Sequence, residues 1–361
     1  MTSAISALTT VYEKRAIPSS GDLPIIGVTS NTAPWELLRA AGFQPILLSP
    51  RHEQTPRADR HMEDAFSPRI KAIFDFLVSP EAAALSAVLI PRTSEQEHKL
   101  YLYLREVMRQ GLETAPPPIL YNLLQARSPE AQAYGLERTR ELKQQLERMT
   151  GRAIEAEAMT AAIAEGNAAR SVVRGLLRLR ECPGPRLAGS EALALIGAWY
   201  FMDRTEYRQL ARTALQEIET RGPITGPRVL MKEPPLGSRD ICSMIEAQGA
   251  IVVAEDDWWG SRAASDDIDV TADPLGAIFE RYYFDAPSPR VFPSSTADAW
   301  FRQKAQEVDG VVFYLPEEDD TLGWDYPRLR NFLDERAIPH LMLRTASSER
   351  AGAFVKGLGH G

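Results

Sequence analysis

The sequence predicts an α/β protein with two flavodoxin-like parallel-sheet domains joined by a helical segment. Apolar runs of strand length alternate with amphipathic runs of helical length, which is the order of a parallel sheet with right-handed crossovers. This alternation stops at 123–222, where Ala, Leu, Glu and Arg recur at helical spacing, and then resumes. A chain of 361 residues also exceeds what one hydrophobic core usually serves.

The first α/β domain is expected over residues 1–122, with a short helical cap at its start. Its strands are apolar runs of the length typical of buried parallel strands. Pro34 suits the first turn of the helix after the first strand, and Gly42 is placed to end that helix. We expect the strands at 24–29, 43–48, 87–91 and 119–122.

The helical bridge, residues 123–222, is expected to hold three or four helices. Ser128 and Pro129 form a typical helix start, with Ser as the N-cap and Pro at the first position. An arginine stripe runs along the second half of the bridge. We interpret it as a solvated helix face whose side-chain stems lie along the protein surface, although it could bind an anion. The stripe consists of Arg170, Arg174, Arg178 and Arg180.

The second α/β domain, residues 223–361, is expected to repeat the strand, loop, helix, glycine, strand order of the first. Gly249 takes the place that Gly42 has in the first domain. The carboxyl ends of the strands of the two domains are expected to face each other across a cleft, where ligands of open α/β sheets bind. We expect strands at 228–231, 250–254, 308–314 and 339–343, and helices at 240–248, 273–284, 326–336 and 349–358.

Composition excludes some classes of partner. A net charge of −8 argues against nucleic acid or an anionic membrane as the main partner. No apolar run approaches the about 18 residues of a membrane span, and the start lacks the pattern of a secretory signal, so a cytoplasmic location is expected. Cys182 and Cys242 show no Cys-x-x-Cys pattern and are interpreted as free thiols.

Polar clusters follow three of the expected strands, at 92–95, 255–257 and 317–320. If the domains face each other, these side chains converge, and crowded carboxylates can act as acid and base or hold a hard divalent cation. Solvated acidic loops are the alternative interpretation. The helix start at Gly237 and Ser238, beside Arg239, could bind a phosphate through free backbone N–H groups.

Six segments carry a family resemblance that runs from about residue 27 to 354. In order and spacing they resemble the subunits of 2-hydroxyacyl-CoA dehydratases and benzoyl-CoA reductases, including the D-component of 2-hydroxyglutaryl-CoA dehydratase. The segments are PWELLRAAGFQPILL, VLIPRTSE, QQLERMTGRAI, SMIEAQGAIVVAEDDWWGSR, DGVVFY and WDYPRLRNFLDERAIPHLMLR.

The resemblance implies two α/β domains that hold a [4Fe-4S] cluster through cysteines at the cleft. It also implies pairing with a related subunit and an electron supplied by an ATP-driven activator. That electron makes a ketyl radical from a CoA thioester and so allows elimination of water or ring reduction. At the positions that the resemblance assigns to the cluster cysteines, this chain has Ser67, Ser94 and Asp319. Hydroxyl and carboxylate oxygens bind iron–sulfur clusters poorly.

The leading hypothesis is therefore a cluster-less paralogue or non-redox subunit that binds an acyl-CoA in the interdomain cleft. No cofactor is predicted on this chain alone. Its partner would be a cluster-bearing family subunit or a second copy of itself, with a possible ATP-driven activator. Whether the chain is itself an enzyme stays open; if catalytic, it would be a lyase or a subunit of a reductase complex.

The alternatives are a non-redox enzyme with cleft carboxylates and a scaffold without catalysis. The catalytic candidates are Ser94, Glu95, Asp319 and Asp320, and the candidates for ligand binding are Asn31, Glu36, Gly237, Ser238, Arg239 and Asp256.

Overall fold

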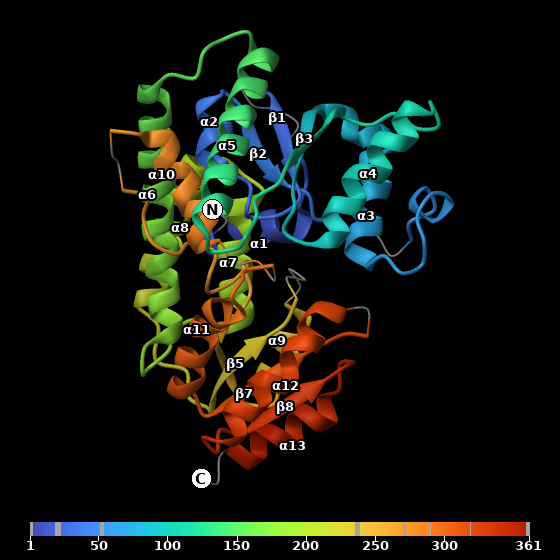
Figure 1. Cartoon of the computed structure of the whole chain (residues 1–361). Coiled ribbons are helices and arrows are strands. Elements are labelled where there is room, and N and C mark those ends of the chain that lie inside the picture. Colours follow the sequence, from blue (N-terminus) through green and yellow to red (C-terminus); the bar gives the residue numbers. More distant parts are fainter. Residues whose placement is uncertain are drawn as a thin grey trace.

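A computed structural model of the chain shows two four-stranded parallel sheets connected by a group of helices (Figure 1). It describes residues 3–18, 23–50, 54–234, 239–269, 272–286, 288, 290–317 and 319–358, with only the backbone of 320 and 321. The strand orders are β2-β1-β3-β4 and β6-β5-β7-β8, so the second sheet repeats the topology of the first. In each sheet the strand that follows the central first strand in sequence lies on one side of it, and the later strands lie on the other side. The strand order therefore reverses between β1 and β3 in the first sheet and between β5 and β7 in the second. The predicted α/β class with two flavodoxin-like sheets is confirmed.

The first sheet has all four strands where the sequence predicts them. Gly42 has a φ of +89°, in the region that favours glycine, and it ends α2 as expected. The helix before this sheet, α1, packs against α7 and α8 of the helical segment. The elements are α1 (Ala4–Lys14), β1 (Ile25–Val28), α2 (Trp35–Ala40), β2 (Gln44–Leu47), α3 (Pro68–Leu77), β3 (Leu85–Pro91), α4 (Glu95–Arg109) and β4 (Pro118–Tyr121).

The helical segment contains four α-helices, the longest of which lies beside both sheets (Figure 1). Ser128 caps the first of them, as predicted, by accepting a hydrogen bond from the N–H of Ala131. The helices are α5 (Pro129–Thr150), α6 (Ala156–Glu181), α7 (Gly189–Gly197) and α8 (Arg204–Glu219). The division of the chain at residues 122 and 222 stays a prediction.

The predicted arginine stripe on α6 is not a uniformly solvated face. Arg170 and Arg180 are only 1% and 0% exposed. Arg170 is ion-paired with Glu36 of α2, and Arg180 with Glu255 of β6. The stripe was expected to be exposed to solvent because charged side chains are rarely buried without a partner. We call the part of the chain that contains β1 to β4 the first half and the part that contains β5 to β8 the second half. A carboxylate from each half supplies the partner of a buried arginine, so α6 is anchored to both halves.

The second sheet also has its four strands at the predicted places. One helix, α11, was not predicted, and α12 begins at 320 rather than at 326. Asp319 caps α12 by accepting a hydrogen bond from the N–H of Leu322, which leaves Pro327 inside the helix. The elements are β5 (Arg228–Lys232), α9 (Asp240–Glu246), β6 (Ile251–Glu255), α10 (Pro274–Glu280) with a π-helical turn (Arg281–Asp285), α11 (Ser294–Lys304), β7 (Gly310–Tyr314), α12 (Asp320–Asp334), β8 (His340–Leu343) and α13 (Ser348–Leu358).

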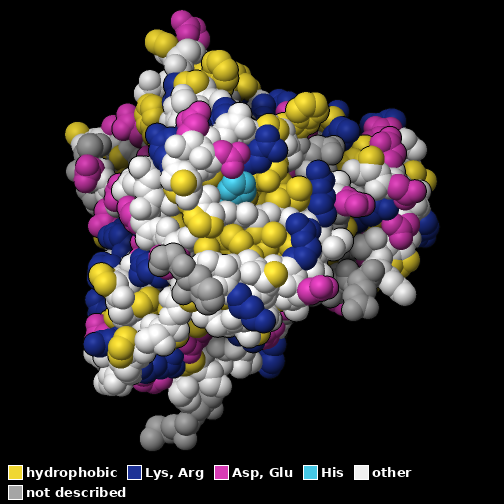
Figure 2. Space-filling model, turned by 90° about the horizontal axis from the view of Figure 1, so that it is seen from below, with side chains coloured by type: hydrophobic (Ala, Val, Ile, Leu, Met, Phe, Trp, Pro, Cys, Tyr) yellow, Lys and Arg dark blue, Asp and Glu magenta, His cyan; other side chains and the backbone are white. Residues whose placement is uncertain are grey.

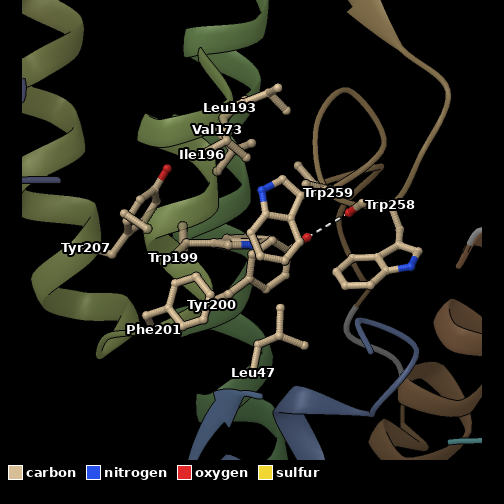
Figure 3. Packing of buried hydrophobic residues seen from close by; sticks show 14 of the residues in the cluster. Leu47, Val173, Leu193, Ile196, Trp199, Tyr200, Phe201, Tyr207, Trp258 and Trp259 are labelled. Carbon is tan, nitrogen blue, oxygen red and sulfur yellow. Dashed lines mark hydrogen bonds between the residues drawn. The ribbon is translucent and has the colours of Figure 1, made fainter. Parts of the chain in front are cut away.

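One hydrophobic core joins the two halves. Trp258 and Trp259, in the loop after β6, pack against aromatic side chains that follow α7 (Figure 3). The ring centroids of Tyr200 and Trp259 are 5.1 Å apart, and the Tyr200 hydroxyl donates to the Trp258 carbonyl at 2.7 Å. Leu47 at the end of β2 belongs to the same cluster. The loop of the second half is therefore part of the packing of the first.

The surface mixes both signs of charge. On the face seen from below in Figure 1, Lys and Arg side chains are interspersed with Asp and Glu around a central group of hydrophobic ones (Figure 2). No helix in the described part of the chain is long and apolar enough to cross a membrane. Cys182 and Cys242 are free thiols, as predicted, and Cys242 is fully buried.

Candidate functional site at the carboxyl ends of the strands

Three hydroxyl groups meet at the point where the first sheet reverses its strand order. Ser30 and Thr32 follow β1, and Thr93 follows β3. The Ser30 oxygen lies 2.7 Å from that of Thr93 and 3.0 Å from that of Thr32, and the two threonine oxygens lie 2.5 Å apart. All three side chains are buried. Ligands of open α/β sheets bind at such a point, because the loops diverge there.

Ser94, the next residue after this cluster, begins α4 in a capping box. Its hydroxyl accepts from the Glu97 N–H at 3.2 Å, and the Glu97 carboxylate accepts from the N–H groups of Ser94 and Thr93, each at 3.1 Å. Burial raises the pKa of Glu97, although Arg69 and these donors oppose it. The Ser-x-x-Glu spacing is a readable signal for this arrangement, but the sequence analysis did not use it. Ser94 therefore serves as a helix cap.

Ser67 stands at the N-cap position of α3, close to the first turn of α4. Its N–H donates to the Gln96 side chain at 2.9 Å. Since Gln96 lies in the helix that Ser94 caps, the structure brings the neighbourhoods of Ser67 and Ser94 together. These are two of the three positions that the sequence assigned to former cluster ligands.

The second half of the molecule covers this edge of the first sheet. Ser288 donates to the Thr93 carbonyl at 3.1 Å, and Arg290 donates to the Arg92 carbonyl at 2.9 Å. Glu95, a catalytic candidate, is ion-paired with Arg92 at 2.8 Å and Arg290 at 3.5 Å. These arginines lower the pKa of Glu95 against a raising effect of partial burial. Glu95 is thus an ionised, paired carboxylate.

Asn31, a candidate for ligand binding, also lies at this junction. Its side-chain amide donates to the Trp258 carbonyl at 3.2 Å, whereas its Oδ1 atom is buried without a hydrogen-bond partner among the described residues. The prediction that strand ends of the first half face the second half is therefore supported by the contacts of Asn31, Thr93 and Arg92. Arg239, by contrast, is ion-paired with Glu13 near α1 at 3.1 Å. Gly237 and Ser238 lie outside the described residues.

The equivalent edge of the second sheet carries buried charges instead of hydroxyls. Asp256, after β6, contacts Lys232 at the end of β5 and Arg262, the latter at 2.9 Å. Burial raises the pKa of Asp256, but the two cations outweigh it and lower the pKa overall. Asp256 is therefore held by cations of its own half.

Two neighbouring carboxyl groups, Glu233 and Asp257, have the opposite behaviour. Burial and the nearby carboxylates raise the pKa of Glu233 well above its usual value and that of Asp257 to about 7. Asp257 accepts from the N–H groups of Trp259 and Gly260, whereas the Oε2 atom of Glu233 is buried and has no hydrogen-bond partner in the part of the chain that the structure describes. The sequence analysis missed Glu233, and its position directly after a buried strand was the available signal.

Asp319 caps α12, and its side chain accepts from the Leu322 N–H at 2.9 Å. The side chain of Asp320 and all of Glu318 are not described. Ser94 and Asp319 thus occupy equivalent places, since each caps the helix that follows the third strand of its sheet.

Glu36 of α2 lies deeper, behind two side chains, Arg170 and Tyr282, that line a cavity. It is ion-paired with Arg170 and accepts from the Tyr282 hydroxyl at 2.7 Å. Burial would raise its pKa, but Arg170, Arg204 and Tyr282 together lower it. The cavity offers about 40 Å³ to water-sized molecules. Its polar lining includes Ser30, Asn31, Arg170, Arg204, Arg281 and Tyr282, of which Asn31 was predicted to bind a ligand and Arg170 was placed in a stripe that could bind an anion.

A [4Fe-4S] cluster does not fit the residues at the three assigned positions. Ser67, Ser94 and Asp319 offer oxygen atoms, and Ser94 and Asp319 accept helix-capping hydrogen bonds. The Cys242 thiol is buried in α9, and burial raises its pKa, which opposes the thiolate form that a cluster needs. Among the described side chains, no group of three or more His, Cys, Asp or Glu is arranged to hold a metal ion.

Comparison with known proteins agrees with the resemblance seen in the motifs. The family model described as 2-hydroxyglutaryl-CoA dehydratase, D-component, matches residues 31–356, which include β2 to β4, the second sheet and the helices between them. The (R)-phenyllactyl-CoA dehydratase beta subunit of Clostridium sporogenes is 22% identical over 331 residues, covering 89% of this chain and 86% of that protein. The chain therefore belongs to the 2-hydroxyglutaryl-CoA dehydratase D-component family.

Proposed function

We propose that the chain is a cluster-less subunit of a 2-hydroxyacyl-CoA dehydratase-type system. In this proposal it binds an acyl-CoA thioester between its halves and acts beside a cluster-bearing partner subunit. The carrying observation is that Ser94 and Asp319, at assigned cluster positions, cap α4 and α12 through hydrogen bonds of 3.2 and 2.9 Å. An oxygen that caps a helix has a structural role that does not need a cluster.

The partner is proposed on two grounds. The relative that matches most of the chain is named as a beta subunit, and so is one part of an assembly. A chain without the thiolates for a cluster also needs another subunit to supply the electron-carrying group. The acyl-CoA is proposed from the family, whose described activity is a CoA dehydratase.

The test of the cluster-less proposal is anaerobic purification of the chain alone, followed by reconstitution with iron and sulfide. A cluster-bearing family subunit treated in parallel is the control. We expect the control to acquire the visible absorption of a [4Fe-4S] cluster and this chain to acquire none. One cluster per chain, with matching iron and sulfide content, would overturn the proposal.

The partner and the ligand need separate measurements. Co-expression with a cluster-bearing family subunit is expected to give a complex that stays together in size-exclusion chromatography. Calorimetric titration of that complex with a 2-hydroxyacyl-CoA, and with free CoA as the control, is expected to show saturable binding only for the thioester. Two separate peaks, or equal binding of both compounds, would contradict the subunit and thioester parts respectively.

A second candidate function is acid–base catalysis without redox chemistry, and one observation favours it. Glu233 and Asp257 are both buried, and the charge of Asp257 helps to raise the pKa of Glu233. Both carboxyl groups have raised pKa values, as a general acid or base requires. Its test is turnover of a 2-hydroxyacyl-CoA by the chain alone. Activity should disappear in Glu233→Gln and persist in Glu317→Gln, because Glu317 is exposed. Absence of turnover in the unaltered chain removes this candidate.

A further inference from the structure

The cavity beneath α2 is lined by three buried arginines that come from different parts of the chain. Arg170 belongs to α6, Arg204 begins α8, and Arg281 begins the π-helical turn after α10. Their exposures are 1%, 6% and 8%, and every lining residue except Asn31 is buried. Positive charge is thus gathered in a confined space.

Among the described side chains, Arg170 is the one of these three cations that forms an ion pair with a buried carboxylate, Glu36, which also has favourable charge interactions with Arg204 and Arg281 over longer distances. Arg204 is stacked between two indole rings instead, with its guanidinium carbon 4.3 Å from the ring centroid of Trp35 and 3.9 Å from that of Trp199. Its Nε and Nη1 atoms are buried without a hydrogen-bond partner in the described part of the chain.

Arg281 likewise has fewer hydrogen-bond acceptors around it than its guanidinium group has donors. Its Nη2 atom donates to the Ala264 carbonyl at 2.9 Å, but its Nε and Nη1 atoms are buried without partners among the described residues. Asp285 has a favourable charge interaction with Arg281 and lies on the exposed surface. The ring nitrogen of Trp199 is another buried donor without a described partner. The cavity therefore has several unsatisfied donors and a surplus of positive charge.

Such an arrangement is costly unless an anion completes it. A buried charge without a counter-ion destabilises the folded state, and a buried N–H without an acceptor adds to that cost. Burial lowers the pKa of Arg204 to about 10, so it remains charged at neutral pH. Deprotonation thus does not relieve the excess charge, and a bound acceptor of negative charge does.

The shape of the space selects the kind of anion. About 40 Å³ for water-sized molecules accommodates roughly three waters, which matches the three heavy atoms of a carboxylate group. The planar guanidinium fork suits a carboxylate, with which it forms paired hydrogen bonds. Val28, Leu38 and Leu47 provide an apolar wall for a short aliphatic chain.

We propose that this cavity is a binding site for a small aliphatic carboxylate, with Arg204 and Arg281 as its charged partners. The proposal does not depend on the proposed function, because it concerns a free carboxylic acid and the chain alone. Its probe is propionate.

The experiment is isothermal titration calorimetry of the full chain with sodium propionate at constant ionic strength, with sodium chloride and sodium phosphate as comparison anions. We expect saturable binding of propionate, little effect of chloride and weaker binding of phosphate. Arg281→Gln and Arg204→Met should each weaken propionate binding at least tenfold. Arg174→Gln is the matched control, since Arg174 lies on the same helix as Arg170 but is partly exposed and paired with Asp267. That variant should bind as the unaltered chain does.

Thermal unfolding of the same variants separates a ligand role from a purely structural one. If the arginines are under-compensated, the ligand-free Arg281→Gln protein should unfold within a few degrees of the unaltered chain and should no longer gain stability from propionate. Absence of saturable binding to the unaltered chain overturns the proposal. So does binding that the variants leave unchanged, equal stabilisation by all three anions, or failure of both arginine variants to fold.

Discussion

The two sheets share one topology but carry different chemistry at equivalent places. At the strand ends of the first sheet, Ser30, Thr32 and Thr93 form a buried group of neutral hydroxyls. At the strand ends of the second, buried carboxylates and cations take that place, with Asp256 held between Lys232 and Arg262. A repeated fold therefore does not imply a repeated site.

This difference also shows how each half is attached to α6. The first half offers Glu36 from a helix, paired with Arg170 of the cavity lining, whereas the second offers Glu255 from a strand, where Ser261 also donates to it at 3.4 Å. We expect mutations in the second half to act mainly on stability and those around the cavity to act on binding.

The largest effect is expected at the ion pair of the second half. Arg180→Met leaves Glu255 buried without its partner, which held it at 2.5 and 2.7 Å, and should lower the free energy of unfolding by about 3–5 kcal/mol. Urea denaturation followed by circular dichroism measures this. Arg109→Met is the control, because its pair with Glu106 is exposed to solvent and should contribute little to stability. Equal losses in both variants would mean that the second half does not rely on buried charge.

The next effect concerns pH. The pKa of Asp257 is about 7 in the folded chain against 3.8 as its ordinary value, so the folded state holds the proton more tightly. The resulting stability is fully present below pH 3.8 and is lost as pH rises through about 7, by about 4 kcal/mol at most. Asp257→Asn should flatten this loss in unfolding curves recorded from pH 5 to 8.

The neighbouring Asp256 provides the opposite control for this pH effect. Its pKa is lowered by Lys232 and Arg262 after burial is taken into account. The stability that ionised Asp256 contributes is therefore present above its ordinary pKa of 3.8 and is lost as the pH falls through its lower pKa in the folded chain. Asp256→Asn should therefore destabilise the chain at pH 7, where Asp257→Asn stabilises it. The same sign for both variants would contradict the assigned protonation states.

A smaller effect is expected at Gly166 of α6, on the side of the first half. An added Cβ atom there would lie 2.6 Å from the Glu36 carboxylate and 3.1 Å from Arg170. Gly166→Ala should cost about 1–3 kcal/mol in thermal or urea unfolding, because this buried pair cannot move into solvent. In α12 of the second half, Gly323 has no described neighbour within 4 Å of such an atom, so Gly323→Ala should stabilise by up to about 1 kcal/mol.

The smallest effect compares equivalent helix caps. Ser94→Ala and Asp319→Ala should each cost about 1 kcal/mol of unfolding free energy, since each removes one capping hydrogen bond. Ser94→Thr keeps the hydroxyl and should restore most of the loss. A cost several times larger at either position would show that the side chain does more than cap its helix.

The strands could be predicted because a buried parallel strand is a continuous apolar run, which is visible without knowledge of its neighbours. Helix α12 was placed too late because Pro327 resembles a first-turn proline, and only the cap at Asp319 shows otherwise. Helix α11 begins with three small hydroxyl residues, Ser294, Ser295 and Thr296, which favour loops as strongly as helix starts.

The candidate site was predictable only in its location. The ends of β3 and β6 were correctly identified as polar, but whether a carboxylate there is free or paired depends on residues far away in the chain. Glu95 meets Arg290, and Glu36 meets Arg170, across long sequence separations. Arg170 was interpreted as part of a solvated stripe for the same reason, because no periodic pattern within α6 distinguishes it from the partly exposed Arg174. Arg204 and Arg281 were not named as candidates.

The packing of Trp258 and Trp259 against Tyr200 has a consequence for how the molecule comes apart. Since the loop after β6 completes a core shared with the helices and β2, neither sheet can melt without uncovering aromatic surface of the other. The chain should therefore lose its structure in one cooperative transition. A fragment that ends at residue 222 should aggregate, because its largest aromatic surface would face water.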